Sequence, residues 1–435
     1  MAQISQQLTI DIGSTGIRMG EFEYPQAGES MILHRFKVVE YAEQITEANR
    51  HVVISDAIRS AYEEGGFTTN RCSVSVSGQA AFMRFVKLPP VREEEARIKQ
   101  IVEYEARQNV PFPMDEVIWD YQLFSTGESD EDLEVMFVVI KNDIVESVIA
   151  AVKSVGLKPK IVDFAPAALY NVARANHIGE EECSMLLNIG GRCTTLLFLD
   201  GNRFFARTIP IAGFSITQQI AKEFGIGNEE AEVLKRRHGF VALGGAYEEP
   251  ESEVAATISK IVRNVMTRLH GEINRSISVY RTQQKGRKPT HLYLSGGSST
   301  MAFTDHFFSE KLRMEVSYLN PFKIVTLDPA MDIKALQEVA HMLPEVVGVG
   351  LRMSVTCPVE VTLIPESEER RIRFFQRVPW MVGAIVLWLA LLVVMTLAYK
   401  RVDTLYRDAT AKREQRVTAL EQKRKKIERA RDNQQ

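Results

Sequence analysis

The stretch LTIDIGSTGIR, residues 8–18, has the residue types of a phosphate-binding turn. An apolar strand runs into Asp11, and the small residues Gly13, Ser14 and Thr15 follow it. Small residues let the backbone approach a ligand closely, and successive N–H groups of such a turn form a concavity that binds anions. The stretch therefore predicts a cradle for the phosphates of a nucleotide.

Two later stretches repeat this pattern: MLLNIGGRCTT, residues 185–195, and HLYLSGGSST, residues 291–300. Each is typical of a buried strand that ends in paired small residues where a turn must begin. Three such turns at the carboxyl ends of strands, about a subdomain apart, indicate a two-lobed clamp around one nucleotide. From the turns alone, three unrelated strand-to-turn junctions in an α/β protein remain the alternative.

Composition restricts the class of protein further. The 435 residues suffice for two or three cores. Lys and Arg (53) nearly balance Asp and Glu (56), so no basic field suggests a nucleic-acid partner. The four cysteines show neither C-x-x-C spacing nor histidines at zinc-ligand intervals, which favours reduced thiols in the cytosol. The start, MAQISQQLT, does not have the pattern of a secretory signal.

Residues 378–399, VPWMVGAIVLWLALLVVMTLAY, form an uncharged run between Arg377 and Lys400. About 20 apolar residues in a helix cross a hydrocarbon core of roughly 30 Å. Trp380 and Tyr399 lie where interfacial aromatic residues are found. The run predicts one transmembrane helix, followed by a charged helical tail over residues 400–435.

The elements that must position the turns follow from hydrophobic periodicity. A strand meander over 8–40 precedes a helix over 45–64 and a strand over 72–77. Residues 80–163 are expected to form a compact β-α-β-β-α-β insert within the first lobe. Its expected elements are strands at 82–90, 117–124, 135–141 and 160–164 and helices at 92–110 and 143–155. A helix over 166–175 then returns the chain to the first lobe.

The second half begins with the same strand-turn-strand pattern as the first, which indicates a structural duplication. The expected helices span 214–224, 228–238 and 253–284, and a last helix lies within 332–353. The helix over 228–238 has an acidic first turn and a basic last turn, as the helix dipole favours. Its basic end is most often simply a solvated helix face, and the loop over 239–253 has no chemistry that the sequence assigns.

Several motifs together resemble the PilM family of pilus assembly proteins, relatives of FtsA in the actin-like ATPase superfamily. The resemblance covers residues 7–353. It rests on DIGSTGIR at 11–18, EYEARQNVPFPMDEVIWDY at 103–121, AEVLK at 231–235, EINRSISVY at 272–280, LSGGSS at 294–299, NPF at 320–322 and GVGLR at 348–352. It implies an α/β, two-lobed actin-like fold with an inserted small α+β subdomain. The implied lobes are 1–183, with the insert at about 80–163, and 184–356, with a helical subdomain at about 226–286.

The segment VTLIP, residues 361–365, followed by ESEERRIRFFQR and the apolar run, resembles the amino-terminal part of PilN. In that family a short INLLP-type segment docks on PilM. The resemblance implies that residues 357–377 are a docking segment, with contacts from Val361, Thr362, Leu363, Ile364 and Pro365, in cis or on a second copy. A tether raises the local concentration of such a segment to roughly millimolar. The alternative is a short strand before an unrelated membrane anchor.

The resemblance also assigns nucleotide-binding roles. Asp11 is expected to hold Mg²⁺ through water, and Gly13, Ser14 and Thr15 to donate to the terminal phosphates. Arg18 stands where the family more often has Lys, so its planar guanidinium need not reach the same oxygen. The other expected contacts of ATP or ADP are Asn188, Gly190, Gly191, Thr194, Thr195, Gly213, Glu232, Lys235, Ser295, Gly296, Gly297 and Ser298.

Asn188 departs from the superfamily, which usually has Asp at this place. A neutral amide can hold a metal-bound water but cannot act as a carboxylate base. We therefore expect nucleotide binding with slow or absent hydrolysis, and assign no catalytic residue.

The favoured function is a membrane-anchored, nucleotide-binding scaffold of a type IV pilus or related type II secretion system. Its expected partners are PilN- and PilO-like platform proteins and the assembly ATPase, and a homodimer is left open. Basic residues flank both ends of the apolar run, so charge does not orient it. An ATP-binding body belongs in the cytoplasm, which places the tail in the periplasm. The alternatives are an FtsA-like division or cytoskeletal tether and a small-molecule kinase of the same fold.

Overall fold

The chain divides into two compact units, Met1–Pro365 and Glu366–Gln435. The computed structural model describes residues 5–25, 30–87, 95–125, 133–243 and 252–432. The connection between the expected strands at 117–124 and 135–141, most of the loop over 239–253 and the segment 88–94 lie largely or wholly outside these ranges. Each unit is therefore described from its own residues.

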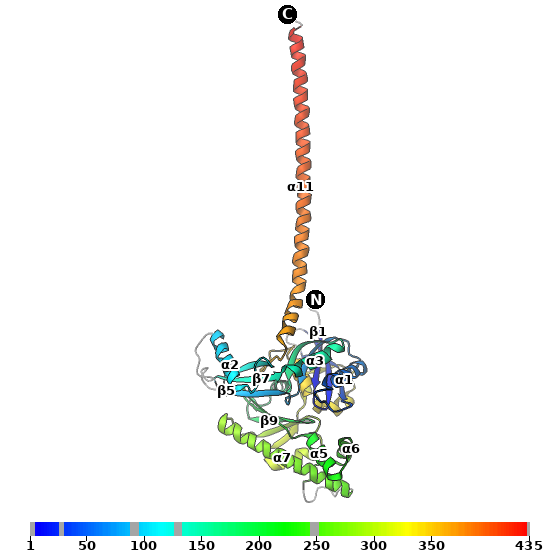
Figure 1. Ribbon diagram of the computed structural model, residues 1–435, viewed down its shortest axis with the longest axis vertical. Helices are drawn as coiled ribbons and strands as arrows, with labels where there is room; N and C mark the ends of the chain where they lie inside the picture. The colour runs from blue at the N-terminus through cyan, green and yellow to red at the C-terminus, as the bar shows by residue number, and fades with distance from the viewer. Residues whose placement is uncertain (1–4, 26–29, 88–94, 126–132, 244–251, 433–435) are drawn as a thin grey trace. The chain divides into compact units, whose positions relative to one another are not determined.

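The first unit contains two sheets with the same topology. In the first sheet the order is β14-β3-β2-β1-β4-β8, and in the second it is β11-β10-β9-β12-β13. Each starts with an antiparallel meander and continues from its first strand into parallel partners. This repeat confirms the predicted duplication and the two lobes. In Figure 1 the elements coloured blue belong to the first lobe, and the helices coloured green belong to the second.

The strands of both sheets are short and mostly buried. The first sheet contains β1 (Ser5–Ile12), β2 (Gly16–Tyr24), β3 (Ile32–Glu40), β4 (Arg71–Val76), β8 (Lys158–Phe164) and β14 (Thr326–Leu327). The second contains β9 (Ser184–Ile189), β10 (Thr194–Asp200), β11 (Arg203–Ile209), β12 (His291–Ser295) and β13 (Glu315–Tyr318).

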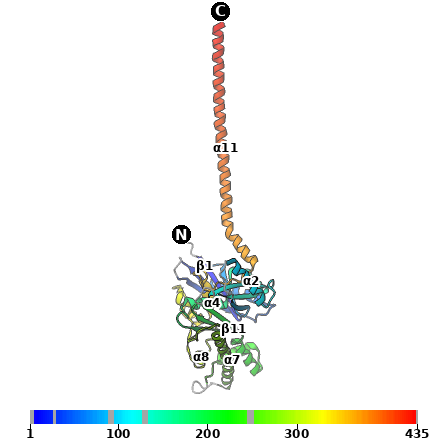
Figure 2. The same ribbon diagram turned by 90° about the vertical axis from the view of Figure 1, so that its left-hand side faces the viewer.

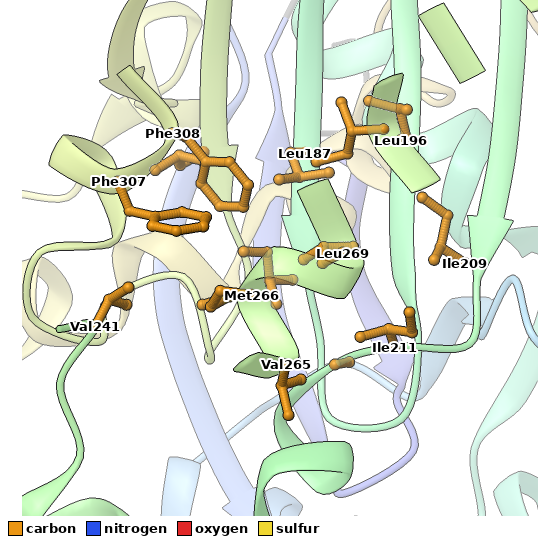
Figure 3. Packing of buried hydrophobic residues seen from close by; sticks show 14 of the residues in the cluster. Leu187, Leu196, Ile209, Ile211, Val241, Val265, Met266, Leu269, Phe307 and Phe308 are labelled. Carbon is orange, nitrogen blue, oxygen red and sulfur yellow. The ribbon is translucent and has the colours of Figure 1, made fainter. Parts of the chain in front are cut away.

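The core of the second lobe forms between its sheet and the long helix α7 (Glu253–Gln283). Figure 3 shows Met266 and Leu269 of α7 among strand residues such as Leu187 and Leu196. Ser252 caps α7 by accepting a hydrogen bond from the N–H of Ala255 at 3.2 Å. The other helices of this lobe are α5 (Gly213–Phe224), α6 (Asn228–His238), α8 (Thr304–Leu312) and α9 (Ile333–Val339).

The insert is smaller than the sequence predicts. It contains β5 (Ala81–Lys87), α2 (Glu95–Asn109), β6 (Val117–Ser125) and β7 (Leu133–Lys141), with sheet order β5-β7-β6. Strand β8 pairs instead with β4 of the first sheet. Helix α3 (Asn142–Ser154) packs against α1 (Arg50–Gly65). The helix expected over 143–155 and the strand expected over 160–164 are both present, but their assignment to the insert is wrong, because periodicity reports burial but not the sheet that a strand joins.

Two helices meet closely near the middle of the first unit. Helix α4 (Ala165–Ala175) packs against α10 (Pro344–Leu351), which also contacts β1, β2 and β4. A Cβ atom at Gly348 would lie 2.0 Å from the carbonyl oxygen of Ala168, so only glycine fits this crossing. Strand β14 and α10 therefore lie against the first lobe, although the expected second lobe, 184–356, includes both.

A histidine ties β14 to the first sheet. His34 of β3 contacts Glu23 of β2 through Nε2 at 2.8 Å and Asp328, just after β14, through Nδ1 at 2.5 Å. Burial alone would lower the pKa of His34, but hydrogen bonds and charge from Asp328 and Glu23 outweigh it and raise this pKa.

We expect this histidine to make stability depend on pH. A raised pKa in the folded protein stabilises it below the unfolded pKa of about 6.5, and this contribution is lost as pH rises through the folded value. Thermal unfolding of the wild type and His34→Gln should therefore differ most at about pH 6 and least at about pH 8.5. A difference in melting temperature that stays constant over this range would contradict the prediction.

The second unit consists of one helix, α11 (Glu366–Asp432). Figure 2 shows it as one long helix coloured from yellow-orange to red. Its most apolar window has a mean hydropathy of 2.6, and it is the one helix among the described residues that is long and apolar enough to cross a membrane. The helical conformation predicted for the apolar run and the tail is confirmed over the described residues.

Candidate functional site

The first and second glycine turns are in contact across the two lobes. The N–H of Arg192 donates to Ser14 Oγ at 3.1 Å. A Cβ atom at Gly191 would lie 2.3 Å from Thr15 Cγ2. The absence of a side chain at Gly191 thus permits the approach that the sequence predicts.

The third glycine turn is hydrogen-bonded to the second. Ser298 donates from its N–H to Ile189 O and from its hydroxyl to Gly190 O, both at 2.9 Å. The N–H of Gly213 donates to Gly190 O at 3.2 Å. Gly296 has a φ of +88°, which only glycine adopts readily, and its N–H donates to His341 O at 2.7 Å. All three turns therefore meet at one place in the first unit.

Asp11 lies at the end of β1 and is almost fully buried. Arg18 Nη1 donates to Asp11 Oδ2 at 3.2 Å across the β1–β2 pair. Burial raises the pKa of Asp11, and the guanidinium of Arg18 opposes this rise. A Cβ atom at Gly13 would lie 2.0 Å from Arg18 Nη1, so the arginine folds back over the turn. In this structure the positive charge that replaces the usual lysine is paired with Asp11.

Asn188, at the end of β9, has a partner that the sequence did not reveal. Its Nδ2 donates to Oε1 of Glu345 at 2.7 Å. Glu345 lies in the first turn of α10 and is 9% exposed. Burial, followed by the nearby charge of Asp11, raises the pKa of Glu345 to about 8. The one available signal was a lone acid within the apolar run LPEVVGVGL at 343–351.

Four of the residues predicted to contact the nucleotide differ in their surroundings, and the first of them is hydrogen-bonded within the protein. The Thr194 hydroxyl donates to Ile211 O at 2.6 Å, and Thr195 is buried beside it in β10. Ser295 is fully buried, and its hydroxyl has no partner among the described residues. Gly297, in contrast, is exposed on the third turn. For these four residues a nucleotide contact stays a prediction.

Lys235 and Glu232 form a network on α6 and α5. Lys235 Nζ donates to Glu232 Oε2 at 2.7 Å, to Thr217 Oγ1 at 3.0 Å and to Gly213 O at 3.3 Å. An ammonium group has three donors, and the protein uses all of them here. Contact of these two residues with ribose or base also stays a prediction.

Two arginines of the second lobe contact the first lobe at the end of β3 and just beyond it. Arg236 Nη2 lies 2.8 Å from Glu40 Oε1, and Arg192 Nη2 donates to Gln44 Oε1 at 3.2 Å. These contacts join the lobes beside the meeting turns, and the sequence analysis missed them.

The side chains around the three meeting turns suit Mg²⁺ better than a metal ion whose ligands all come from the protein. Within the described parts of the chain, no group of three or more His, Cys, Asp or Glu side chains could hold a metal ion. Mg²⁺ is usually bound by one or two carboxylates together with phosphates and water. Asp11, Ser75 and the turns fit this type of site, and the buried Ser75 hydroxyl, opposite Asp11 on β4, lies beside the Asp11 carboxyl and lowers its pKa.

A second feature lies at the other end of α10, where residues 357–364 run through the first unit. Cys357, Val359, Val361 and Leu363 are buried, whereas Pro358 and Glu360 are exposed. This alternation is that of an extended peptide with one face covered. The predicted docking residues Val361, Leu363 and Ile364 are thus buried in cis, and Thr362 and Pro365 are partly exposed.

Polar groups on both sides of the segment hold its backbone. The N–H of Leu363 donates to Val162 O of β8 at 2.7 Å. Asn171 of α4 both accepts from Val359 N at 3.1 Å and donates to Val359 O at 2.8 Å. From the insert, Asp120 accepts from Thr362 N at 2.8 Å. The segment therefore lies between the first lobe and the insert, in what we call the docking groove.

Arg352, directly after α10, joins the groove to the segment. Its Nη1 forms a buried ion pair with Asp163 of β8 at 3.0 Å and also donates to Val361 O. Its Nη2 donates to Thr362 Oγ1 at 3.3 Å. Burial raises the pKa of Asp163, and Arg352 counters this rise.

Comparison with known proteins decides the family. A family described as type IV pilus assembly protein PilM matches residues 9–354. The chain belongs to the PilM family. The match confirms the resemblance inferred from the sequence, and it ends just before the segment that occupies the docking groove.

Two known proteins are similar to this chain. The structure named "PilM-PilN type IV pilus biogenesis complex" superposes with a TM-score of 0.68 at 23% identity, covering 80% of this chain and 99% of that one. Cell division protein FtsA of Escherichia coli (strain K12) is 31% identical over 120 residues, which is 27% of this chain and 28% of FtsA. The chain thus spans little more than a quarter of the length of that relative. The fold is the two-lobed actin-like fold that the sequence predicts.

Proposed function

We propose that the protein is a membrane-anchored, nucleotide-binding scaffold of the inner-membrane platform of a type IV pilus or a related type II secretion system. The observation that carries this proposal is the burial of residues 357–364 in the docking groove. The PilM family match ends at residue 354, so this segment is an addition to the family body. Its occupation of a groove supports the role of a PilN-like docking peptide.

The segment would act in cis, as the contacts of Val359, Thr362 and Leu363 support, or exchange with that of a second copy. Further partners would be PilN- and PilO-like platform proteins and the assembly ATPase. The name of the similar solved complex, which contains PilN, supports a partner of this kind.

Nucleotide binding is supported by the meeting of the three turns. Gly13, Ser14 and Thr15 would face the phosphates of ATP or ADP, with Gly190 and Gly191 opposite. Asp11 would hold Mg²⁺ through water, and the ion would neutralise phosphate charge. In this proposal the residues bind and orient the nucleotide, and turnover has no assigned role.

The full chain is expected to bind ATP with Mg²⁺ and to turn it over far more slowly than about 1 per second, a low rate for an enzyme. Asn188 is not a base, and the raised pKa of Glu345 leaves its carboxyl largely protonated at pH 7. Calorimetry should show binding by the wild type and weaker binding by Asp11→Ala. Phosphate release at ordinary enzyme rates, or unchanged affinity in Asp11→Ala, would contradict this assignment.

The apolar part of α11 would anchor the protein, with the two-lobed body in the cytoplasm and the charged tail in the periplasm. The length and hydropathy of the helix support the anchor. An FtsA-like division tether remains the alternative, and the partial FtsA match favours it only at the level of fold. Co-purification of the protein from cells with pilus platform proteins, rather than with division proteins, would separate the two functions.

A further inference from the structure

A buried carboxyl group from the last helix of the first unit lies at the place where the second glycine turn lacks an acid. Glu345 Oε1 accepts from Asn188 Nδ2 at 2.7 Å, although 157 residues separate them in the chain. Helix α10 also packs against β1, which carries Asp11 at its end. The carboxyl of Glu345 is thus one hydrogen bond away from the position of the missing aspartate.

Arg18 supplies the positive charge near this carboxyl. Among the described residues, no ion pair involves Glu345, and its recorded side-chain partner is the neutral amide of Asn188. Arg18 is already paired with Asp11. Cys193, which feels the charge of Glu345, has a pKa raised chiefly by burial, and His341 has a pKa lowered by burial and by Arg18, so both are neutral at pH 7. Ionising a buried carboxyl without a counter-charge is costly, and a bound cation would relieve this cost.

A second observation points to a ligand at the same place. Ser75 lies opposite Asp11 in the β1–β4 register and is fully buried. Its hydroxyl lies beside the Asp11 carboxyl and lowers the pKa of that group. Nε of Arg18 is buried and has no hydrogen-bond partner within the described residues. Buried polar groups are nearly always hydrogen-bonded in folded proteins. Nε of Arg18 therefore marks a place that a polar ligand would complete.

We propose that Glu345 supplies the carboxylate that position 188 lacks and acts together with Asp11 on the Mg²⁺ of a bound nucleotide. This inference rests on the proposed nucleotide function and adds a residue to its metal site. Asp11 and Glu345 would together supply two carboxyls, the same number as Asp11 and an aspartate at 188. Asn188 would orient the Glu345 carboxyl through its amide.

The test measures the affinity of the full chain for ATP by calorimetry, with Mg²⁺ and with EDTA. The ratio of the two affinities is the gain due to the metal. Glu345→Gln keeps an acceptor for Asn188 and removes only the ionisable oxygen, so a structural role would survive it. We expect this variant to lose the gain by about tenfold or more, with little change in EDTA.

Two further variants sharpen the comparison. Asn188→Asp combined with Glu345→Gln returns a carboxylate to the second turn and should restore the gain to within about threefold of the wild type. Glu134→Gln is the matched control, because Glu134 of β7 is also buried with a raised pKa but lies in the insert. It should leave the gain unchanged.

Each outcome decides the inference. If a folded Glu345→Gln variant gains as much ATP affinity from Mg²⁺ as the wild type does, the role of Glu345 is overturned while nucleotide binding stays intact. Absence of ATP binding by the wild type overturns the proposed nucleotide function, and this inference with it. If Glu345→Gln does not fold, the double variant Asn188→Asp with Glu345→Gln decides. An increase in ATP affinity with Mg²⁺ equal to that of the wild type supports the proposal that Glu345 stands in for a carboxylate at 188, and loss of this increase contradicts it.

Discussion

A synthetic peptide of residues 358–366 should bind a double variant, Val361→Asp with Leu363→Asp, about a thousand-fold more tightly than the wild type. Both side chains are fully buried in the docking groove, and burying two carboxylates there would expel the segment. The emptied groove should then bind the peptide with micromolar affinity, about −8 kcal/mol. In the wild type a tethered segment at roughly millimolar local concentration competes with it. Fluorescence anisotropy with a labelled peptide measures both affinities.

The matched control is Val355→Asp, which makes the same kind of change at a position that is 52% exposed. This variant should exclude the peptide as the wild type does. Equal binding by the wild type and the double variant, or no binding by either, would show that residues 357–364 are only a linker. Tight binding by Val355→Asp would show that the groove opens without displacement of Val361 and Leu363.

Arg352→Met should lower the free energy of unfolding of the two-lobed unit by about 3–5 kcal/mol, the usual effect of leaving one partner of a buried pair uncompensated. Asp163 is fully buried, and its ion pair with Arg352 would be lost together with the contacts to Val361 and Thr362. Chemical denaturation followed by tryptophan fluorescence measures the change, since Trp119 lies in the insert.

Two variants separate the buried pair from charge in general. Adding Asp163→Asn to Arg352→Met removes the stranded carboxylate and should recover more than half of the loss. Arg59→Met breaks an exposed pair with Asp56 on α1 and should change stability by less than about 0.5 kcal/mol. Similar effects from Arg59→Met and Arg352→Met would contradict the proposed importance of the buried pair.

Local patterns predicted the parts of this molecule that depend on neighbouring residues. Small residues after apolar strands indicated the three turns, and the resemblance of VTLIP to the start of PilN suggested the docking segment. Contacts between distant residues could not be read in the same way. Glu345 meets Asn188 only because α10 crosses back to the first lobe, and nothing in periodicity shows that path. Strand β8 reads as buried in either sheet, so its partner β4 was also missed.

Lys235 illustrates a different limit of the sequence. Its motif AEVLK indicates a residue that the fold needs, but not which atoms its ammonium group contacts. The structure shows three donors directed at Glu232, Thr217 and Gly213. A motif can thus mark a position without distinguishing a ligand contact from an internal one.

Helix α10 joins two sites through eight residues, a length of roughly 12 Å. Glu345 in its first turn belongs to the cluster around Asn188, and Arg352 just beyond its last residue holds the segment in the docking groove. The crossing at Gly348 leaves the helix little freedom to bend, so a displacement at one end must appear at the other. If occupation of either site moves α10, thermodynamic linkage requires reciprocity. A bound nucleotide then changes the equilibrium constant for docking of the segment by some factor. Docking of the segment changes the affinity for that nucleotide by the same factor.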